Sequence, residues 1–200
     1  MDIEIGDMHP DEVREATAML ARGMRDVPMN VCVYGQDVER RIRGLEILFR
    51  VLLPAMDVPP LCARQGGRIV GLLGRVPPNA PPIPVSRQIG MVPPLFFHGP
   101  ASLGRLIRYL GESQKHVPRV AHWHVGPVGV DASLQGRGIG TMMMQAFCEA
   151  MDAQRQISCL ETDTPANVRF YQRFGFETVE EAEIHGIHNW FMRRDPAGRS

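Results

Sequence analysis

The sequence has no excess of charge of either sign. Its 22 lysine and arginine residues balance 22 aspartate and glutamate residues, so the formal net charge of the 200 residues is zero at neutral pH. Nucleic-acid binders and polybasic membrane anchors normally carry a basic excess, and the balance argues against both classes. Hydrophobic residues make up 44% of the chain and charged residues 22%, which is typical of a folded globular protein and not of a disordered one.

Long hydrophobic runs are also lacking. Runs such as Leu45–Met56 are interrupted by charge or proline well before the roughly 20 apolar residues that span a bilayer. The opening residues, Met-Asp-Ile-Glu-Ile-Gly-Asp, are acidic and do not have the basic-then-apolar order of a secretion signal. We therefore expect a cytoplasmic protein. Lysine occurs once, at Lys115, and this preference for arginine is typical of a GC-rich bacterial genome.

Cysteine is scarce and shows no metal-binding or redox spacing. There is no CxxC pair, and no histidines follow at zinc-finger distances. Some of the cysteines lie inside apolar patterns, where a thiol behaves as a small buried hydrophobe. We expect four reduced thiols without a metal or disulfide role, namely Cys32, Cys62, Cys148 and Cys159.

The first half of the chain combines helical and extended patterns. Apolar residues two positions apart predict strands, and apolar residues three or four apart predict helices. The expected elements are a strand at Ile3–Ile5, a helix from His9 that ends at Pro28, a loop to Asp37, a helix over Asp37–Leu53, and a hairpin of Leu61–Arg64 with Ile69–Val76. In the second helix, Arg40, Arg41 and Arg43 are expected to lie mostly off the apolar face.

A proline-rich segment follows the hairpin. Eight prolines between Pro77 and Pro100 remove backbone donors and bias the residues before them toward extended shapes, which excludes regular sheet. We expect a long loop packed across the surface, followed by a helix over Ala101–Gln114. No internal repeat and no linker-like change in composition is visible, so a single domain over residues 1–200 is predicted.

The second half has the clearest pattern. It predicts a strand over Val120–Val130, a helix over Gly138–Gln156, a strand over Ile157–Thr162, a helix over Ala166–Phe174, and an antiparallel pair of Phe176–Ile184 with His188–Arg193. This order predicts an α/β fold with a mixed sheet.

The glycine-rich turn Gln135-Gly136-Arg137-Gly138-Ile139-Gly140 lies between the expected strand and helix. Glycines let the backbone approach a ligand closely, and the free amides of the first helical turn favour phosphate oxygens. A Rossmann site would need a different spacing near the chain start, and a Walker site would need a following lysine. The turn therefore predicts a phosphate-binding loop of another kind, to which Arg137 could add a charge-assisted contact.

The residues around this turn carry a resemblance. The pattern joins Val128-Gly129-Val130-Asp131 and Gln135-x-x-Gly138-x-Gly140 to Leu160-Glu161-Thr162 and Asn167-x-x-Phe170-Tyr171-x-x-Phe174-Gly175-Phe176. It resembles the GCN5-related N-acetyltransferase (GNAT) family over roughly residues 119–194. The resemblance to the branch that contains puromycin N-acetyltransferase rests on the blocks His122-Trp123-His124, Leu160-Glu161-Thr162 and Asn189-Trp190-Phe191-Met192.

The resemblance implies a fold and a co-substrate. The fold is a GNAT-like mixed, mostly antiparallel central sheet flanked by helices, with a splayed strand pair at the site of coenzyme A and a variable acceptor-side segment over residues 77–118. The co-substrate is acetyl-CoA, and no metal is needed. The residues implied in cofactor binding are Val128, Gly129, Val130, Gln135, Gly136, Arg137, Gly138, Gly140, Thr141 and Asn167.

The resemblance also implies catalytic residues. Tyr171 matches the tyrosine that protonates the departing thiolate, which suits a phenol with a pKa of about 10. The base that deprotonates the amine is His124 or Glu161, with His122 on the same strand face a further candidate. Each also has a structural interpretation, as a bonded sheet histidine or a residue that orients its neighbours. Phe170, Phe174, Trp123 and Trp190 are expected in the core.

Two functions follow from these residues. The first is transfer of an acetyl group from acetyl-CoA to a primary amine by direct attack in a ternary complex, with alignment of the reactants as a main source of rate. The balanced charge favours a small-molecule acceptor over histone tails or RNA. The alternative is a catalytically silent domain that binds acetyl-CoA as a sensor or partner. A monomer and a homodimer are both compatible with the sequence.

Overall fold

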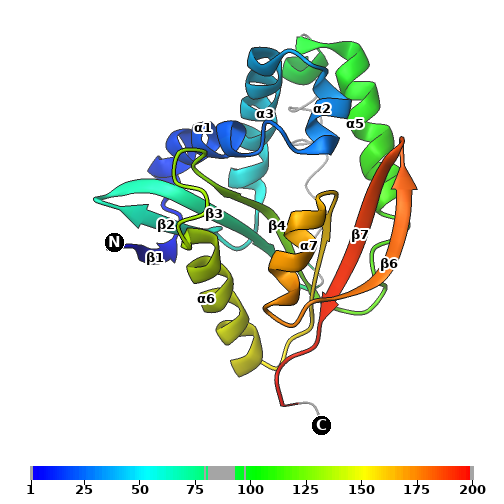
Figure 1. Cartoon of the computed structure of the whole chain (residues 1–200). Coiled ribbons are helices and arrows are strands. Elements are labelled where there is room, and N and C mark those ends of the chain that lie inside the picture. Colours follow the sequence, from blue (N-terminus) through cyan, green and yellow to red (C-terminus); the bar gives the residue numbers. More distant parts are fainter. Residues whose placement is uncertain (1, 79, 81–92, 97, 199–200) are drawn as a thin grey trace.

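The computed structural model describes residues 2–78, 80, 93–96 and 98–198. In these residues a mixed sheet is covered by helices on both faces (Figure 1). The strands are β1 (Glu4–Asp7), β2 (Leu61–Gln65), β3 (Arg68–Val76), β4 (Trp123–Val130), β5 (Ser158–Thr162), β6 (Glu177–Ile184) and β7 (Ile187–Arg194). The helices are α1 (Val13–Gly23), α2 (Pro28–Tyr34), α3 (Val38–Leu52), α5 (Pro100–Ser113), α6 (Ile139–Ala153) and α7 (Pro165–Gln172), with 3-10 turns η1 (Pro10–Glu12) and η2 (Leu53–Ala55).

The strand order in the sheet is β1-β2-β3-β4-β5-β7-β6. Neighbouring strands run antiparallel except β4 and β5, which are parallel. The parallel connection passes through α6, as a parallel crossover requires. The predicted mixed, mostly antiparallel sheet flanked by helices is therefore confirmed. No helix in the described part of the chain is both long and apolar enough to cross a membrane.

Hydrophobic cores lie on opposite faces of the sheet because successive strand residues point to opposite sides. Cys62 and Leu72 pack with α1, α2 and α3, whereas Ala63 and Leu73 pack with α6 and α7. This explains why β3 has a nearly continuous apolar sequence. A third, smaller cluster of Tyr109, Ile184 and Phe191 joins α5 to strands β6 and β7.

Strands β4 and β5 separate soon after they meet. Their pairing consists of Trp123 with Ser158 and His124 with Cys159, and the second half of β4 pairs on its other edge with β3. The register between β3 and β4 shifts between Leu73 and Arg75. The predicted splayed strand pair is therefore present, and among the residues that the structure describes no strand pairs with the β5-facing edge of β4 beyond His124.

The expectation of a loop between Pro28 and Asp37 is wrong for most of that segment. Pro28 begins α2, and the preceding helix α1 already ends at Gly23. Proline suits the first position of a helix because its φ is already helical and its missing N–H would have no partner there. Asp37 was correctly expected at the start of the next helix, where its carboxylate accepts a hydrogen bond from the Arg40 amide at 2.9 Å.

The expectation that Arg41 lies off the buried face of α3 is also wrong. Arg41 is only 4% exposed, whereas Arg40 and Arg43 are exposed as expected. The helical pattern places its side chain at the boundary, and contacts with another segment of the chain bury it. The expected surface loop after Pro77 lies largely outside the described residues, although residues 93–96 are helical.

Candidate functional site

The glycine turn forms the entrance of α6. Gly138 is the N-terminal cap of the helix and has a φ of +85°, in the left-handed region that favours glycine. The first amide that finds an acceptor within the helix is that of Met142, which donates to the Gly138 carbonyl at 3.0 Å. The amides of Ile139, Gly140 and Thr141 therefore remain available to a ligand in front of the helix.

A cleft of about 750 Å³ opens in front of this turn. A Cβ atom added to Gly138 would meet no atom within 4 Å, so the turn borders open space. The wall includes Val128, Gly129 and Val130 of β4, in the half of the strand that has left β5. Free backbone groups on one side and free helix amides on the other suit an extended ligand with a phosphate at one end.

Another part of the lining comes from the end of α1 and the segment after it. Residues 22–27 line the cleft without interruption, and they bring Arg22 and Arg25 as well as Asp26. Arg173, next to the C-terminus of α7, adds a further guanidinium, which lies 5.1 Å from the centre of the Phe170 ring. Sequence reasoning missed these residues because they are far from the glycine turn in the chain and carry no motif of their own.

Tyr171 lines the same cleft from α7. It is buried, and its ring meets Phe170 edge-on at 5.2 Å between centroids. Burial raises the pKa of the Tyr171 phenol above its usual range, and the negative charge of Glu161 adds to the effect. The phenol is therefore protonated at physiological pH and able to donate a proton. Phe170, which was expected only in the core, also lines the cleft.

The base candidates form a second group. The His124 Nε2 and Glu161 Oε2 atoms lie 3.5 Å apart, on β4 and β5 where these strands still neighbour each other. His124 and His122 line a second cavity of about 590 Å³, with Gln114, Arg119 and residues 76–78 among its other lining residues. Burial lowers the pKa of His122, so its imidazole is neutral near pH 7.

The structure thus divides the predicted site residues between these regions. Those that line the first cleft are Val128, Gly129, Val130, Gln135, Gly136, Gly138, Gly140, Thr141, Asn167 and Tyr171. Arg137 is exposed and lies outside this lining. The side chain of Asn167 turns toward the end of β5, where its amide donates to the Thr162 hydroxyl at 3.3 Å. His124 and Glu161 stand apart from the cleft, next to each other.

These features define a mixed α/β protein whose cleft is lined by β4 beyond its pairing with β5 and by a glycine turn at the N-terminus of α6. A family model described as an acetyltransferase (GNAT) domain matches residues 103–178. The N-alpha-acetyltransferase RimI of Mycobacterium tuberculosis is 31% identical over 119 residues, which cover 58% of this chain and 75% of that protein. The chain therefore belongs to the GNAT acetyltransferase family.

Solved structures of the family share the fold. A Corynebacterium glutamicum structure described as histone acetyltransferase HPA2 and related acetyltransferase aligns with a TM-score of 0.73 and 17% identity, and covers 98% of each chain. A GNAT family acetyltransferase from Brucella melitensis, solved in complex with acetyl-CoA, aligns with a TM-score of 0.55 and 16% identity over 97% of this chain and 88% of that one. At these identities the likeness concerns the fold.

Burial at the site leads to a prediction about all three tyrosines of the chain. Burial raises the pKa of Tyr34, Tyr109 and Tyr171. We expect a spectrophotometric titration of the folded protein to show no phenolate absorbance up to pH of about 10, where the chain unfolded in guanidinium chloride shows half of its phenols ionised. Because the folded state holds these protons more tightly, stability should fall as the pH rises above that value.

The Tyr171→Phe variant shows which part of the phenolate absorbance in this titration comes from Tyr171. The difference spectrum between this variant and the unmodified protein should contain no phenolate signal below the pH at which the folded protein unfolds in alkali. A native phenol that titrates at pH about 10 and disappears in this variant would show that Tyr171 is not desolvated as described.

Proposed function

We propose that the protein transfers an acetyl group from acetyl-CoA to a primary amine by direct attack in a ternary complex. One observation carries the proposal: a single cleft connects the glycine cradle, the unpaired edge of β4 and the phenol of Tyr171. Bound acetyl-CoA would supply the thioester carbonyl that the amine attacks. The chain supplies binding groups and the proton donor Tyr171 along the cleft, and the proton acceptor His124 in the lining of the second cavity.

The cofactor-binding residues have separate tasks in this proposal. The amides of Gly136, Arg137, Gly138, Gly140 and Thr141 hold the pyrophosphate, and the backbone of Val128 and Val130 pairs with the pantetheine arm. Asn167 binds near the sulfur side. We add Arg22, Arg25 and Arg173 as cations that attract the phosphates, because they line the same cleft.

Two proton transfers complete the reaction. The attacking amine loses a proton, which His124 accepts, with the Glu161 carboxylate 3.5 Å away to stabilise the imidazolium. The new N–C bond forms as the C–S bond breaks, and Tyr171 donates its proton to the departing thiolate. The amine would enter through the second cavity, since His124 lines it. A backbone amide of β4 near Val128 would stabilise the developing oxyanion.

We favour a small-molecule amine because the chain carries no net charge to attract nucleic acid or a histone tail. The blocks around His122 and Asn189 support the branch that resembles puromycin N-acetyltransferase. A protein N-terminus is the second candidate acceptor, since the similar M. tuberculosis protein is an N-alpha-acetyltransferase.

Calorimetric titration with acetyl-CoA, paired with a thiol-release assay over small amines and short peptides, tests the proposal. Binding together with thiol release supports an enzyme, and the amines that react decide between the two acceptor classes. Binding without release from any amine would favour the silent sensor, and a chain that does not bind acetyl-CoA would overturn the assignment of the cleft.

The cradle is tested by Gly138→Glu. The new carboxylate would fill the space in front of α6 and repel the phosphates, so we expect no measurable binding of acetyl-CoA by calorimetry. Gly67→Glu is the matched control, because it places the same side chain at another exposed glycine with a left-handed φ, of +77°, and open space around it, in the turn between β2 and β3. Unchanged binding by Gly138→Glu would contradict the cradle.

The acid is tested by Tyr171→Phe. Loss of the proton donor should lower kcat by about a hundredfold, the usual contribution of a general acid, with little change in the affinity for acetyl-CoA. Tyr34→Phe removes a buried hydroxyl outside the cleft lining and should leave kcat unchanged. An unaltered rate in Tyr171→Phe would remove the phenol from the mechanism.

The base is tested by His124→Gln. We expect kcat/KM to fall about a hundredfold, and Glu161→Gln to cause a smaller loss because Glu161 acts through the imidazole. His188→Gln on β7 is the control, since His188 also pairs with a glutamate, Glu181, at 2.8 Å. If Glu161→Gln alone abolished turnover, Glu161 and not His124 would be the base.

A further inference from the structure

The segment between α1 and α2 forms a wall of the cleft but has no regular structure of its own. Met24–Asp26 is a turn between the end of α1 and the start of α2. Surface connections of this kind are mobile unless other parts of the chain restrain them. The position of Arg25 and Asp26 in the cleft wall therefore depends on what holds this turn.

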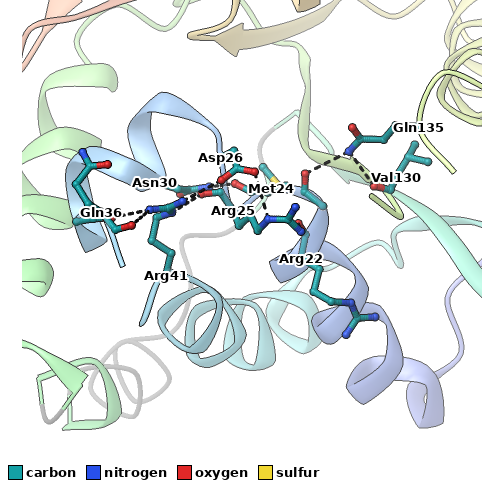
Figure 2. A network of polar contacts seen from close by, with 11 residues as sticks. Arg22, Met24, Arg25, Asp26, Asn30, Gln36, Arg41, Val130 and Gln135 are labelled. Carbon is teal, nitrogen blue, oxygen red and sulfur yellow. Dashed lines mark hydrogen bonds and ion pairs between the residues drawn. The ribbon is translucent and has the colours of Figure 1, made fainter. Parts of the chain in front are cut away.

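Arg41 of α3 supplies the main restraint (Figure 2). Its Nε donates to the Arg25 carbonyl at 2.7 Å, and its Nη2 donates to the Asp26 carboxylate at 2.9 Å. Its Nη1 donates to the carbonyls of Gly35 and Gln36 at 2.9 and 2.7 Å. One guanidinium thus joins the turn before α2 to the turn after α2.

The same segment is held at its two ends by other side chains. Asn30, which is fully buried, donates to the Met24 carbonyl at 2.8 Å. Gln135 of the glycine turn lies 3.4 Å from the Gly23 carbonyl and 3.3 Å from that of Val130. Asp163 at the end of β5 accepts a hydrogen bond from the Met29 amide at 2.7 Å. Between these anchors, Arg41 holds the part that faces the cleft.

Close packing makes the position of this wall sensitive to small shifts. A Cβ atom at Gly23 would lie 2.6 Å from the Val130 carbonyl oxygen, so α1 ends directly against β4. The wall formed by residues 22–27 therefore adjoins β4 through a direct backbone contact at Gly23 and Val130. A turn that moved from this arrangement would change the width of the cleft.

We propose that Arg41 is a positioning residue that holds the Met24–Asp26 turn in the wall of the cleft and thereby sets the affinity for acetyl-CoA. The proposal rests on the proposed function for the identity of the ligand. Arg41 is absent from the cleft lining in the described residues, so it acts through the turn. The planar guanidinium matters because it directs several N–H groups at once, whereas a lysine ammonium is a single point charge.

The test compares Arg41→Lys with Arg50→Lys, which makes the same change at an exposed position of α3. For Arg41→Lys we expect the dissociation constant and KM of acetyl-CoA to rise about tenfold, with kcat at saturation changed by less than about threefold. Arg50→Lys should match the unmodified protein. A higher KM with a nearly unchanged kcat indicates that Arg41 positions the wall of the cleft. A general loss of active protein would instead lower the apparent kcat.

Hydrogen exchange of the ligand-free protein tests the restraint without the cofactor. The amides of residues 24–27 should exchange faster in Arg41→Lys, and those in the centre of α6 should not change. Equal exchange of residues 24–27 in the two proteins would overturn the positioning role. If the unmodified protein did not bind acetyl-CoA, the proposed function would be overturned instead. The failure of the positioning role and the failure of the proposed function are therefore distinguishable.

Asp26→Ala covers the case in which Arg41→Lys does not fold, because the Asp26 side chain is 65% exposed. Removing a carboxylate beside an anionic ligand should by charge alone tighten binding. Loss of the restraint predicts the opposite, a dissociation constant about threefold higher. Tighter or unchanged binding of acetyl-CoA by Asp26→Ala would overturn the proposal, and weaker binding would support it.

Discussion

Strands β4 and β5 are paired as parallel neighbours at two positions, and the arrangement of the rest of the structure depends on their separation. A strand edge inside a protein carries backbone N–H and C=O groups that need partners. Beyond His124 no strand in the described part of the chain pairs with the β5-facing edge of β4, and the cleft lies along that part of β4. An elongated ligand with amide groups can take the place of the missing strand, which is the principle of strand addition.

The two sheet faces contribute differently to this opening. The core with α6 and α7 places the glycine turn and Tyr171 beside the cleft, and the core with α1 to α3 places residues 22–27 in the lining of the same cleft. Figure 1 shows α6 and α7 near β4, and α1 to α3 grouped at the other side of the fold. The cleft is therefore bounded by segments from both halves of the chain, and its width depends on both cores.

Much of this arrangement could be predicted from local patterns. The apolar periodicity predicted the strands β2 to β7 and the helices α3, α5, α6 and α7 to within a few residues, because these elements bury one continuous face or stripe. The pattern around Gly138 predicted a helix N-terminus with free amides. The helix α2 was missed because Pro28 was interpreted as a stop alone, although proline also starts helices.

The sequence by itself determined the order of the elements, the glycine cradle and the residue types available for proton transfer, since each depends on neighbours a few positions apart. Only the tertiary structure decided that Arg41 is buried, that residues 22–27 form a cleft wall, and that His124 lies next to Glu161. The contacts of Arg41 with Arg25 and Asp26 join residues that are 16 and 15 positions apart in the chain. Periodicity reports which side of an element is apolar, but it does not report which distant carbonyl or carboxylate a polar side chain will meet.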